Sequence, residues 1–211
     1  MTTATMTVHE ALAELKMLDN RILKAIENAN FAVANKHANT RIDGKTVATF
    51  VEDAGSAYQR ICDLTARRKA IKHALSLSNA ATKVSIAGKE YTVAEAIEMK
   101  RSGMELKKSL LCTLEAQLNQ ARRAVEKANR ELAEKADLYV TGLFGSKEKV
   151  SGAEAGTVRE AYITANTAEV VALYGIEAKM EALNAEVAAF ESEVDSRLSI
   201  SNALTTITIT Y

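Results

Sequence analysis

Two segments of the sequence, residues 75–86 and 198–209, are near copies of each other. Seven of their twelve positions are identical, and two others exchange one aliphatic residue for another. The first copy is followed by Thr92-Val93-Ala94-Glu95-Ala96, whereas the matching Thr7-Val8-His9-Glu10-Ala11 lies at the start of the chain. This order indicates a duplication that is cut open inside one unit. It predicts that the two chain ends lie side by side and rebuild what residues 82–96 form continuously.

Composition favours long helices and one domain over residues 1–211. The chain has 211 residues, of which 47% are hydrophobic and 5% aromatic, and it contains no proline or tryptophan. Abundant Ala, Glu, Lys and Leu without proline are typical of closely packed helices. We therefore predict a mainly α fold, an elongated antiparallel four-helix bundle.

Apolar residues at three- and four-residue steps mark four helical segments. We expect helices over about 8–33, 47–77 and 93–140, and a fourth that starts after Thr157 or Thr167, carries Val170 and Leu173 on its apolar face and ends near Leu198. Thr7 with Glu10, and Thr92 with Glu95, have the spacing of a capping box. A kink near Gly103 or an overhang is expected, because the third helix is much longer than the first.

Alternating residues predict short strands at one end of the bundle. Residues 82–92 suit a hairpin, and the alternating Thr and Ile of 205–211 suit a strand. Asp43-Gly44 suits a two-residue hairpin turn toward the opposite end. We expect a small β cap built from about 1–7, 82–92 and 203–211. Val84, Ile86, Ile207 and Ile209 should face the bundle, and Thr206, Thr208 and Thr210 the other side.

Three further segments have competing interpretations. The repeated Ser-Asn-Ala-x-Thr predicts helix stops at Asn79 and Asn202, or alternatively a twofold pair of polar side chains in a binding pocket. Arg67-Arg68-Lys69 indicates a solvated face or pairing with an acidic helix, with a phosphate or nucleic-acid role as the minor alternative. Residues 141–157, with four glycines, predict a mobile loop whose tip is Leu143-Phe144.

No pattern in the chain points to catalysis. His9, His37 and His73 lack metal-ligand spacing, the closest glycine pattern lacks the Gly-Lys-Ser/Thr of a phosphate cradle, and Cys62 and Cys112 resemble small buried hydrophobes. We predict no enzyme, no catalytic residue, no cofactor and no metal. Zero net charge argues against a nucleic-acid partner. Without a signal-like start or a membrane-length apolar run, we expect a cytoplasmic protein.

The order of these motifs resembles a small helical family whose members are labelled septicolysin. Its pattern is carried here by Glu10-Ala11-Leu12, Asn79-Ala80-Ala81-Thr82, Glu95-Ala96-Ile97 and Asn202-Ala203-Leu204-Thr205. The longer third helix, the 141–157 segment and the longer Thr/Ile tail depart from it. The resemblance implies a helical fold and an oligomer, and it supplies no catalytic residues. The family label implies a pore-forming toxin, but the chain has no membrane-length run and no aromatic-rich tip.

Three functional hypotheses follow. The first is a non-enzymatic oligomeric structural or assembly protein, such as a bacteriophage particle component or accessory protein, in the cytoplasm or in a virion assembled there. The alternatives are a septicolysin-like membrane-active factor and a small-ligand-binding oligomer. We expect self-association or other assembly proteins as partners. The predicted contact residues are Leu143, Phe144, Ile207, Ile209 and Tyr211.

Overall fold

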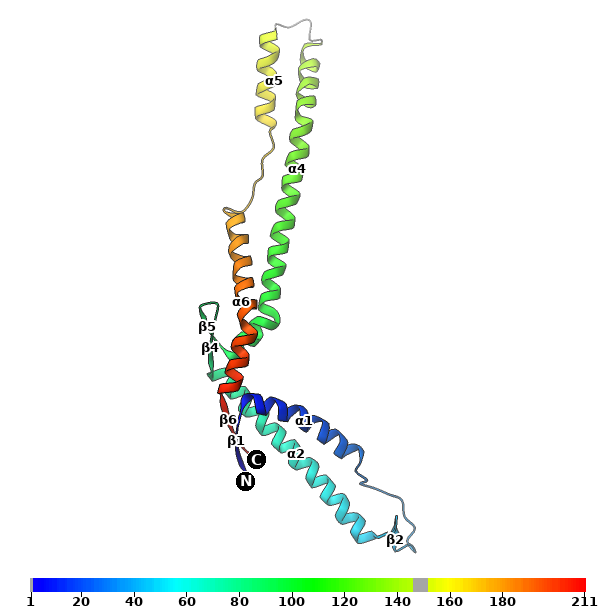
Figure 1. The fold of residues 1–211 in the computed structure, drawn as a ribbon. Coiled ribbons are helices and arrows are strands. Elements are labelled where there is room, and N and C mark those ends of the chain that lie inside the picture. Colours follow the sequence, from blue (N-terminus) through cyan, green and yellow to red (C-terminus); the bar gives the residue numbers. More distant parts are fainter. Residues whose placement is uncertain (1, 146–151) are drawn as a thin grey trace. The chain divides into compact units, whose positions relative to one another are not determined.

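The computed structural model describes residues 2–145 and 152–211 and is mainly α-helical with small antiparallel sheets (Figure 1). This confirms the predicted mainly α class, while the four-helix arrangement stays a prediction. The chain divides into two compact units, Met1–Gly103 with Ala189–Tyr211, and Met104–Ala188. A single domain over residues 1–211 also stays a prediction.

The first unit holds most of the short elements. In chain order these are β1 (Thr3–Thr7), α1 (Val8–Glu27), β2 (Arg41–Ile42), β3 (Lys45–Thr46), α2 (Val47–Ala81), β4 (Lys83–Ile86), β5 (Lys89–Thr92), α3 (Val93–Glu98), the π-helical η1 (Met99–Gly103), the end of α6 (Ile176–Leu204) and β6 (Thr206–Thr210). The second unit holds α4 (Met104–Phe144), α5 (Gly152–Asn166) and the start of α6.

The two ends of the chain rebuild the hairpin that β4 and β5 form continuously. β1 pairs with β6 antiparallel and places Thr7 opposite Thr206, just as β5 places Thr92 opposite Lys83. The backbone N–H of Val8 donates to the oxygen of Thr205 at 2.9 Å, and that of Val93 donates to Thr82 at 2.9 Å. The N and C labels lie together beside these strands in Figure 1. The predicted pairing of the chain ends is confirmed.

The predicted continuous β cap is wrong. β1–β6, β2–β3 and β4–β5 are separate two-stranded sheets in the described part of the chain. Each strand pair forms hydrogen bonds only within its own hairpin-like unit, so the repeat gives two small sheets instead of one. The β2–β3 hairpin turns at Asp43 and Gly44, both at positive φ (50° and 81°), as the Asp-Gly turn predicts.

Both predicted capping boxes are present with the same geometry. The Thr7 hydroxyl oxygen accepts from Glu10 N at 3.2 Å, and the Glu10 carboxylate accepts from Thr7 N at 2.8 Å. Thr92 and Glu95 repeat this at 3.2 and 2.7 Å. These bonds satisfy amides that have no partner inside the helix. They fix the start of α1 and α3 at equivalent positions of the repeat.

Acid should weaken both capping boxes. Hydrogen bonds from the backbone N–H and hydroxyl of Thr7 lower the pKa of Glu10 below 4.5, and those of Thr92 lower the pKa of Glu95. A carboxylate with a lowered folded-state pKa stabilises above its unfolded pKa, and the contribution disappears as pH falls through the folded value. The free energy of unfolding should therefore fall less below pH 4.5 in E10Q/E95Q than in the wild-type protein.

Urea titrations at about pH 7 and about pH 3 measure this difference. Glu115→Gln, which removes an exposed carboxylate outside both boxes, is the control. An equal acid-induced loss of stability in the double variant and the wild type would show that the boxes do not couple folding to pH.

The inner faces of the paired strands form the core of the first unit. Ile207 and Ile209 are buried, and Thr206, Thr208 and Thr210 are exposed, as the alternation predicts. One buried cluster joins β6 with α1 and α2: Val8, Ala11, Leu15, Leu18, Ile71, Leu75, Ile207 and Ile209. Val84 and Ile86 of β4 are buried as well. The repeat thus buries the same two strand positions twice.

The predicted helix stops at Asn79 and Asn202 are wrong. Both residues lie inside the last turn of their helices, because α2 runs to Ala81 and α6 to Leu204. Thr82 N donates to Ser78 O at 2.8 Å and Thr205 N to Ser201 O at 2.9 Å, so helical bonding continues until strand pairing begins. The two asparagines remain structurally equivalent, and the pocket interpretation stays a prediction.

The third helix is interrupted where the sequence predicts it. η1 is π-helical and ends at Gly103. A Cβ at this glycine would lie 2.6 Å from the sulfur of Met99, so a larger residue would displace that side chain. The wider turn and the missing Cβ together separate α3 from α4.

The predicted 141–157 loop is largely replaced by helix. Residues 141–144 continue α4, and residues 152–157 belong to α5, while 146–151 lie outside the described residues. The predicted fourth helix is also wrong at its start. Val170 and Leu173 lie outside any helix or strand, and α6 begins at Ile176 after Gly175, which has a φ of 65°.

Candidate interaction surface

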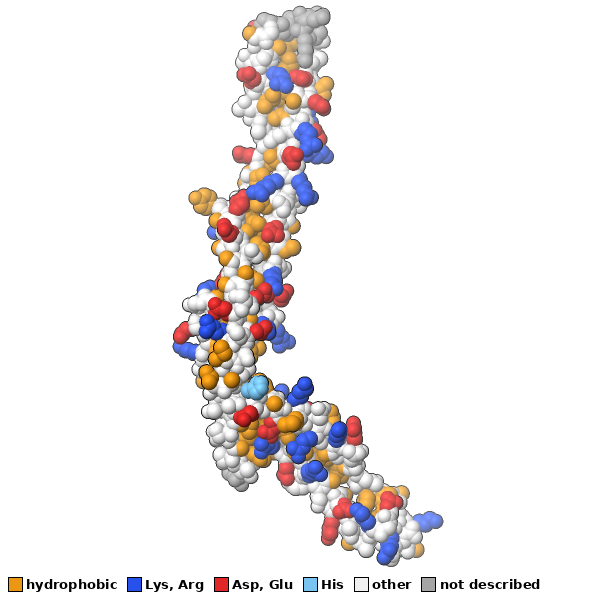
Figure 2. All heavy atoms as spheres, in the orientation of Figure 1, with side chains coloured by type: hydrophobic (Ala, Val, Ile, Leu, Met, Phe, Trp, Pro, Cys, Tyr) orange, Lys and Arg blue, Asp and Glu red, His pale blue; other side chains and the backbone are white. Residues whose placement is uncertain are grey.

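The segment that joins α5 to α6 exposes a continuous run of apolar side chains. Val170, Val171, Leu173 and Tyr174 are 36%, 88%, 55% and 95% exposed. Hydrophobic groups stand out from the surface where this segment meets α6 (Figure 2). Single exposed apolar residues are ordinary, but a contiguous patch marks an interaction site. We name residues 169–174 the linker strand for the pairing that we propose below; in this structure residues 169–173 belong to no helix or strand, and Tyr174 lies in a turn.

Asn129 of α4 holds the start of the linker strand. Its side-chain amide donates to the oxygen of Ala168 at 2.9 Å, and its Oδ1 accepts from the N–H of Ala168 at 2.8 Å. Both backbone groups of one residue are thereby bound by one side chain. Among the described residues, no hydrogen bond reaches the backbone of 169–172. These N–H and C=O groups are free to pair with another strand.

The helices around the linker strand are tied together within the second unit. Tyr139 of α4 stacks on Tyr162 of α5 with ring centroids 4.5 Å apart, and Arg159 donates to Asp137 at 2.8 Å. On the α6 side, Arg122 pairs with Glu177 at 2.7 Å and Lys107 with Glu186 at 2.8 Å. These contacts join the helices on either side of the linker strand within the second unit.

The predicted contact pair Leu143-Phe144 lies at the end of α4. Leu143 is 55% exposed and Phe144 is half-buried. They share the second unit with other exposed apolar residues of α4, including Leu106 at 72% and Leu138 at 71%. A contact role for Leu143 and Phe144 stays a prediction, now on a helix end and not on a loop tip.

The other predicted contact residues belong to the first unit. Ile207 and Ile209 lie in the core at 5% and 2% exposure, which leaves little of either side chain for a partner. Tyr211 is half-buried under Arg67, whose guanidinium carbon lies 4.9 Å from the ring centroid and whose Nη1 donates to the Tyr211 hydroxyl. Their role in contacts stays a prediction, while their packing in the fold is shown.

Two arginines of the basic cluster at residues 67–69 of α2 pair with acidic residues of α1. Arg67 Nη2 donates to Glu14 Oε2 at 2.9 Å, and this interaction is the first cause that raises the pKa of Arg67 above its ordinary value. Arg68 forms an ion pair with Asp19. The interpretation of this cluster as paired with an acidic helix is therefore confirmed for both arginines.

Chemical groups that could act on a substrate do not gather in the described residues. Within them, no three His, Cys, Asp or Glu side chains are grouped so that they could hold a metal ion. Cys62 is half-buried and Cys112 exposed, and neither forms a disulfide. None of the helices in residues 2–145 and 152–211 has the length and apolar content that crossing a membrane requires.

Comparison with protein-family models, characterised proteins and solved structures gave no match. The septicolysin-like resemblance stays a prediction. The linker strand is the feature that the sequence interpretation missed. The sequence signal for it is the pair of β-branched residues Val170-Val171 ahead of Gly175. The helical spacing of Val170, Leu173 and Ile176 obscured this signal.

Proposed function

We propose that this chain is a non-enzymatic structural or assembly protein that works as an oligomer of its own copies. The observation that carries the proposal is the linker strand, an exposed apolar segment with free backbone groups. Burying one Val, Leu or similar side chain contributes roughly 1.5–3 kcal/mol. Four such side chains left in water therefore favour a partner that covers them.

Exposure elsewhere supports the same proposal. In the described part of the chain, 22 large hydrophobic side chains are exposed, as many as the 22 apolar residues that are buried. The formal net charge is zero, so little electrostatic repulsion opposes association of identical copies. A protein that exposes as many large apolar side chains as it buries apolar residues, and that has no net charge, is better suited to an assembly than to a monomeric state.

A second copy of the linker strand is the partner we propose for it. Antiparallel pairing about a twofold axis would place one residue opposite its own copy, for example Ala172 opposite Ala172, with Val171 opposite Leu173 of the second copy. Such an interface is self-complementary and closed, and strand addition of this kind draws its affinity from main-chain hydrogen bonds. Its length is limited by Ala168, bound by Asn129, and by Leu173 O, which accepts from Ile176 N at 3.0 Å.

The setting we propose is a bacteriophage particle or its assembly in the host cytoplasm. The proline-free, alanine-rich helices and the zero net charge support this role. The competing role is that of a septicolysin-like membrane-active factor, which would use the same exposed apolar residues against lipid.

Electron microscopy of the purified protein, with dye release from liposomes, separates these roles. An assembly protein should give uniform particles that contain two or more copies and should leave liposomes intact. Single copies on the grid together with rapid dye release would overturn the proposal in favour of a membrane-active factor.

A further inference from the structure

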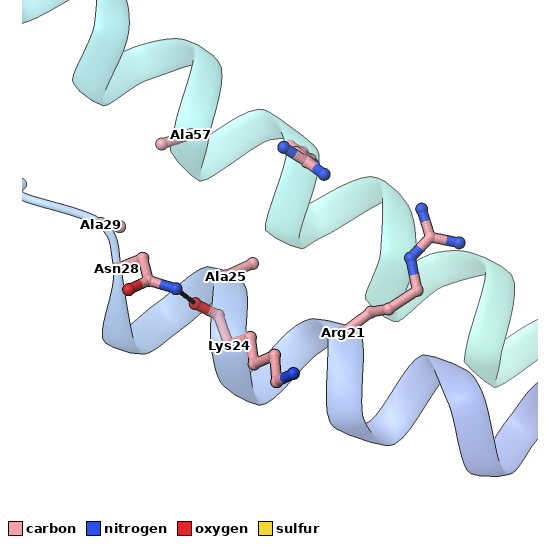
Figure 3. A pocket seen from close by; sticks show the side chains of 7 residues that line it. Arg21, Lys24, Ala25, Asn28, Ala29 and Ala57 are labelled. Carbon is pink, nitrogen blue, oxygen red and sulfur yellow. Dashed lines mark hydrogen bonds between the residues drawn. The ribbon is translucent and has the colours of Figure 1, made fainter.

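A basic hollow lies between α1 and α2, within the first unit. Its volume is about 370 Å³, and its lining residues are Arg21, Lys24, Ala25, Asn28, Ala29, Ala57 and Arg60. Figure 3 shows Arg21 extending from α1 toward α2, with Ala25 on the same side of the helix. Small-molecule sites commonly have volumes of roughly 300–1,000 Å³, so the hollow has room for a small ligand.

The charges of this hollow are not balanced by the protein. Arg21, Lys24 and Arg60 line it, and no carboxylate does. Within the described residues none of these three cations forms an ion pair. Cations nearby on the same helical hairpin do: Lys45 pairs with Asp53, Arg67 with Glu14 and Arg68 with Asp19. Three unpaired cations at one place repel each other, and a bound anion would relieve that repulsion.

Small residues create the space between the two helices. Ala25 and Ala29 on one side and Ala57 on the other leave room where longer side chains would close the gap. Asn28 caps α1, and its Nδ2 donates to the oxygen of Lys24 at 2.8 Å, as the dashed line in Figure 3 marks. That bond fixes the amide at one edge of the hollow.

We infer that this hollow binds a small phosphate-bearing anion. Arginine presents a planar fork of donors that matches phosphate oxygens, and Arg21 and Arg60 would hold the anion from opposite helices. Lys24 adds a third positive charge. A single phosphate would fill only part of about 370 Å³, so a diphosphate or a small phosphate ester is the favoured class. This inference does not depend on the proposed oligomer.

Calorimetric titration with inorganic pyrophosphate at constant ionic strength tests the inference. The wild-type protein should bind pyrophosphate more tightly than inorganic phosphate. Arg21→Gln and Arg60→Gln should each weaken binding by roughly tenfold or more, because each removes a charged hydrogen-bond donor. Both side chains are exposed, so the fold should persist, which circular dichroism checks.

Lys69→Gln is the matched control, since it removes an exposed cation from α2 outside the hollow. Unchanged affinity in this control would support a specific site. Absence of binding in the wild type, or an equal loss in all three variants, would overturn the inference. If the arginine variants instead change the mass of the assembly without affecting anion binding, the hollow receives a second copy and the inference is wrong.

Discussion

Deletion of residues 204–211 should unfold the first unit or lower its melting temperature by roughly 10 °C or more. The deletion removes β6, the partner of β1, and takes Ile207 and Ile209 out of the buried cluster. Each of these side chains contributes roughly 1.5–3 kcal/mol by burial. Their sum is a large part of the roughly 5–15 kcal/mol that stabilises a typical domain. Thermal unfolding followed by circular dichroism measures the effect.

The outer face of the same strand provides the control. Thr206, Thr208 and Thr210 are exposed, so their joint replacement by serine should change the melting temperature far less than the deletion. Ile209→Ala should fall between the two, because it removes part of one buried side chain. A truncated protein that melts at the wild-type temperature would contradict the view that β6 is integral to the fold.

Replacing Val171 and Tyr174 with serine should reduce the oligomer to a smaller species. These side chains are 88% and 95% exposed, so V171S/Y174S should leave the helices of a single chain intact. In a paired linker strand the same change would remove most of the apolar area that the two copies bury. Size-exclusion chromatography with light scattering, at equal protein concentrations, measures the mass of variant and wild type.

Two further variants separate pairing from general apolar contact. Ala172→Pro removes a backbone donor from the linker strand and should also reduce the mass, since strand addition needs that N–H. Leu106→Ser removes an apolar residue of α4 that is 72% exposed and should leave the mass unchanged. If the wild type is an oligomer but V171S/Y174S keeps its mass, another surface joins the copies.

The paired ends and capped helices could be predicted because their signals are local and occur twice. Thr7 with Glu10 and Thr92 with Glu95 specify helix starts within four residues, and the Thr/Ile alternation specifies which strand face is buried. The repeat then relates the two chain ends to one continuous hairpin. No knowledge of distant contacts was needed for these elements.

The linker strand is hard to predict from the sequence because its conformation also depends on a distant residue. Val170, Leu173 and Ile176 have helical spacing, but Asn129 binds the backbone of Ala168 and Gly175 adopts a positive φ. The spacing of apolar residues does not indicate the contact between Asn129 and Ala168, which lie far apart in the sequence. The basic hollow is hidden for the same reason, since Arg21 and Arg60 line one hollow only when α1 packs against α2.

The mass of the wild-type protein in solution tests the proposed function most directly. Light scattering over micromolar concentrations should give a stable multiple of 22.8 kDa, because the exposed apolar side chains of each copy would be covered by another. A monodisperse species of 22.8 kDa across that range would contradict the proposal that this chain acts as an oligomer.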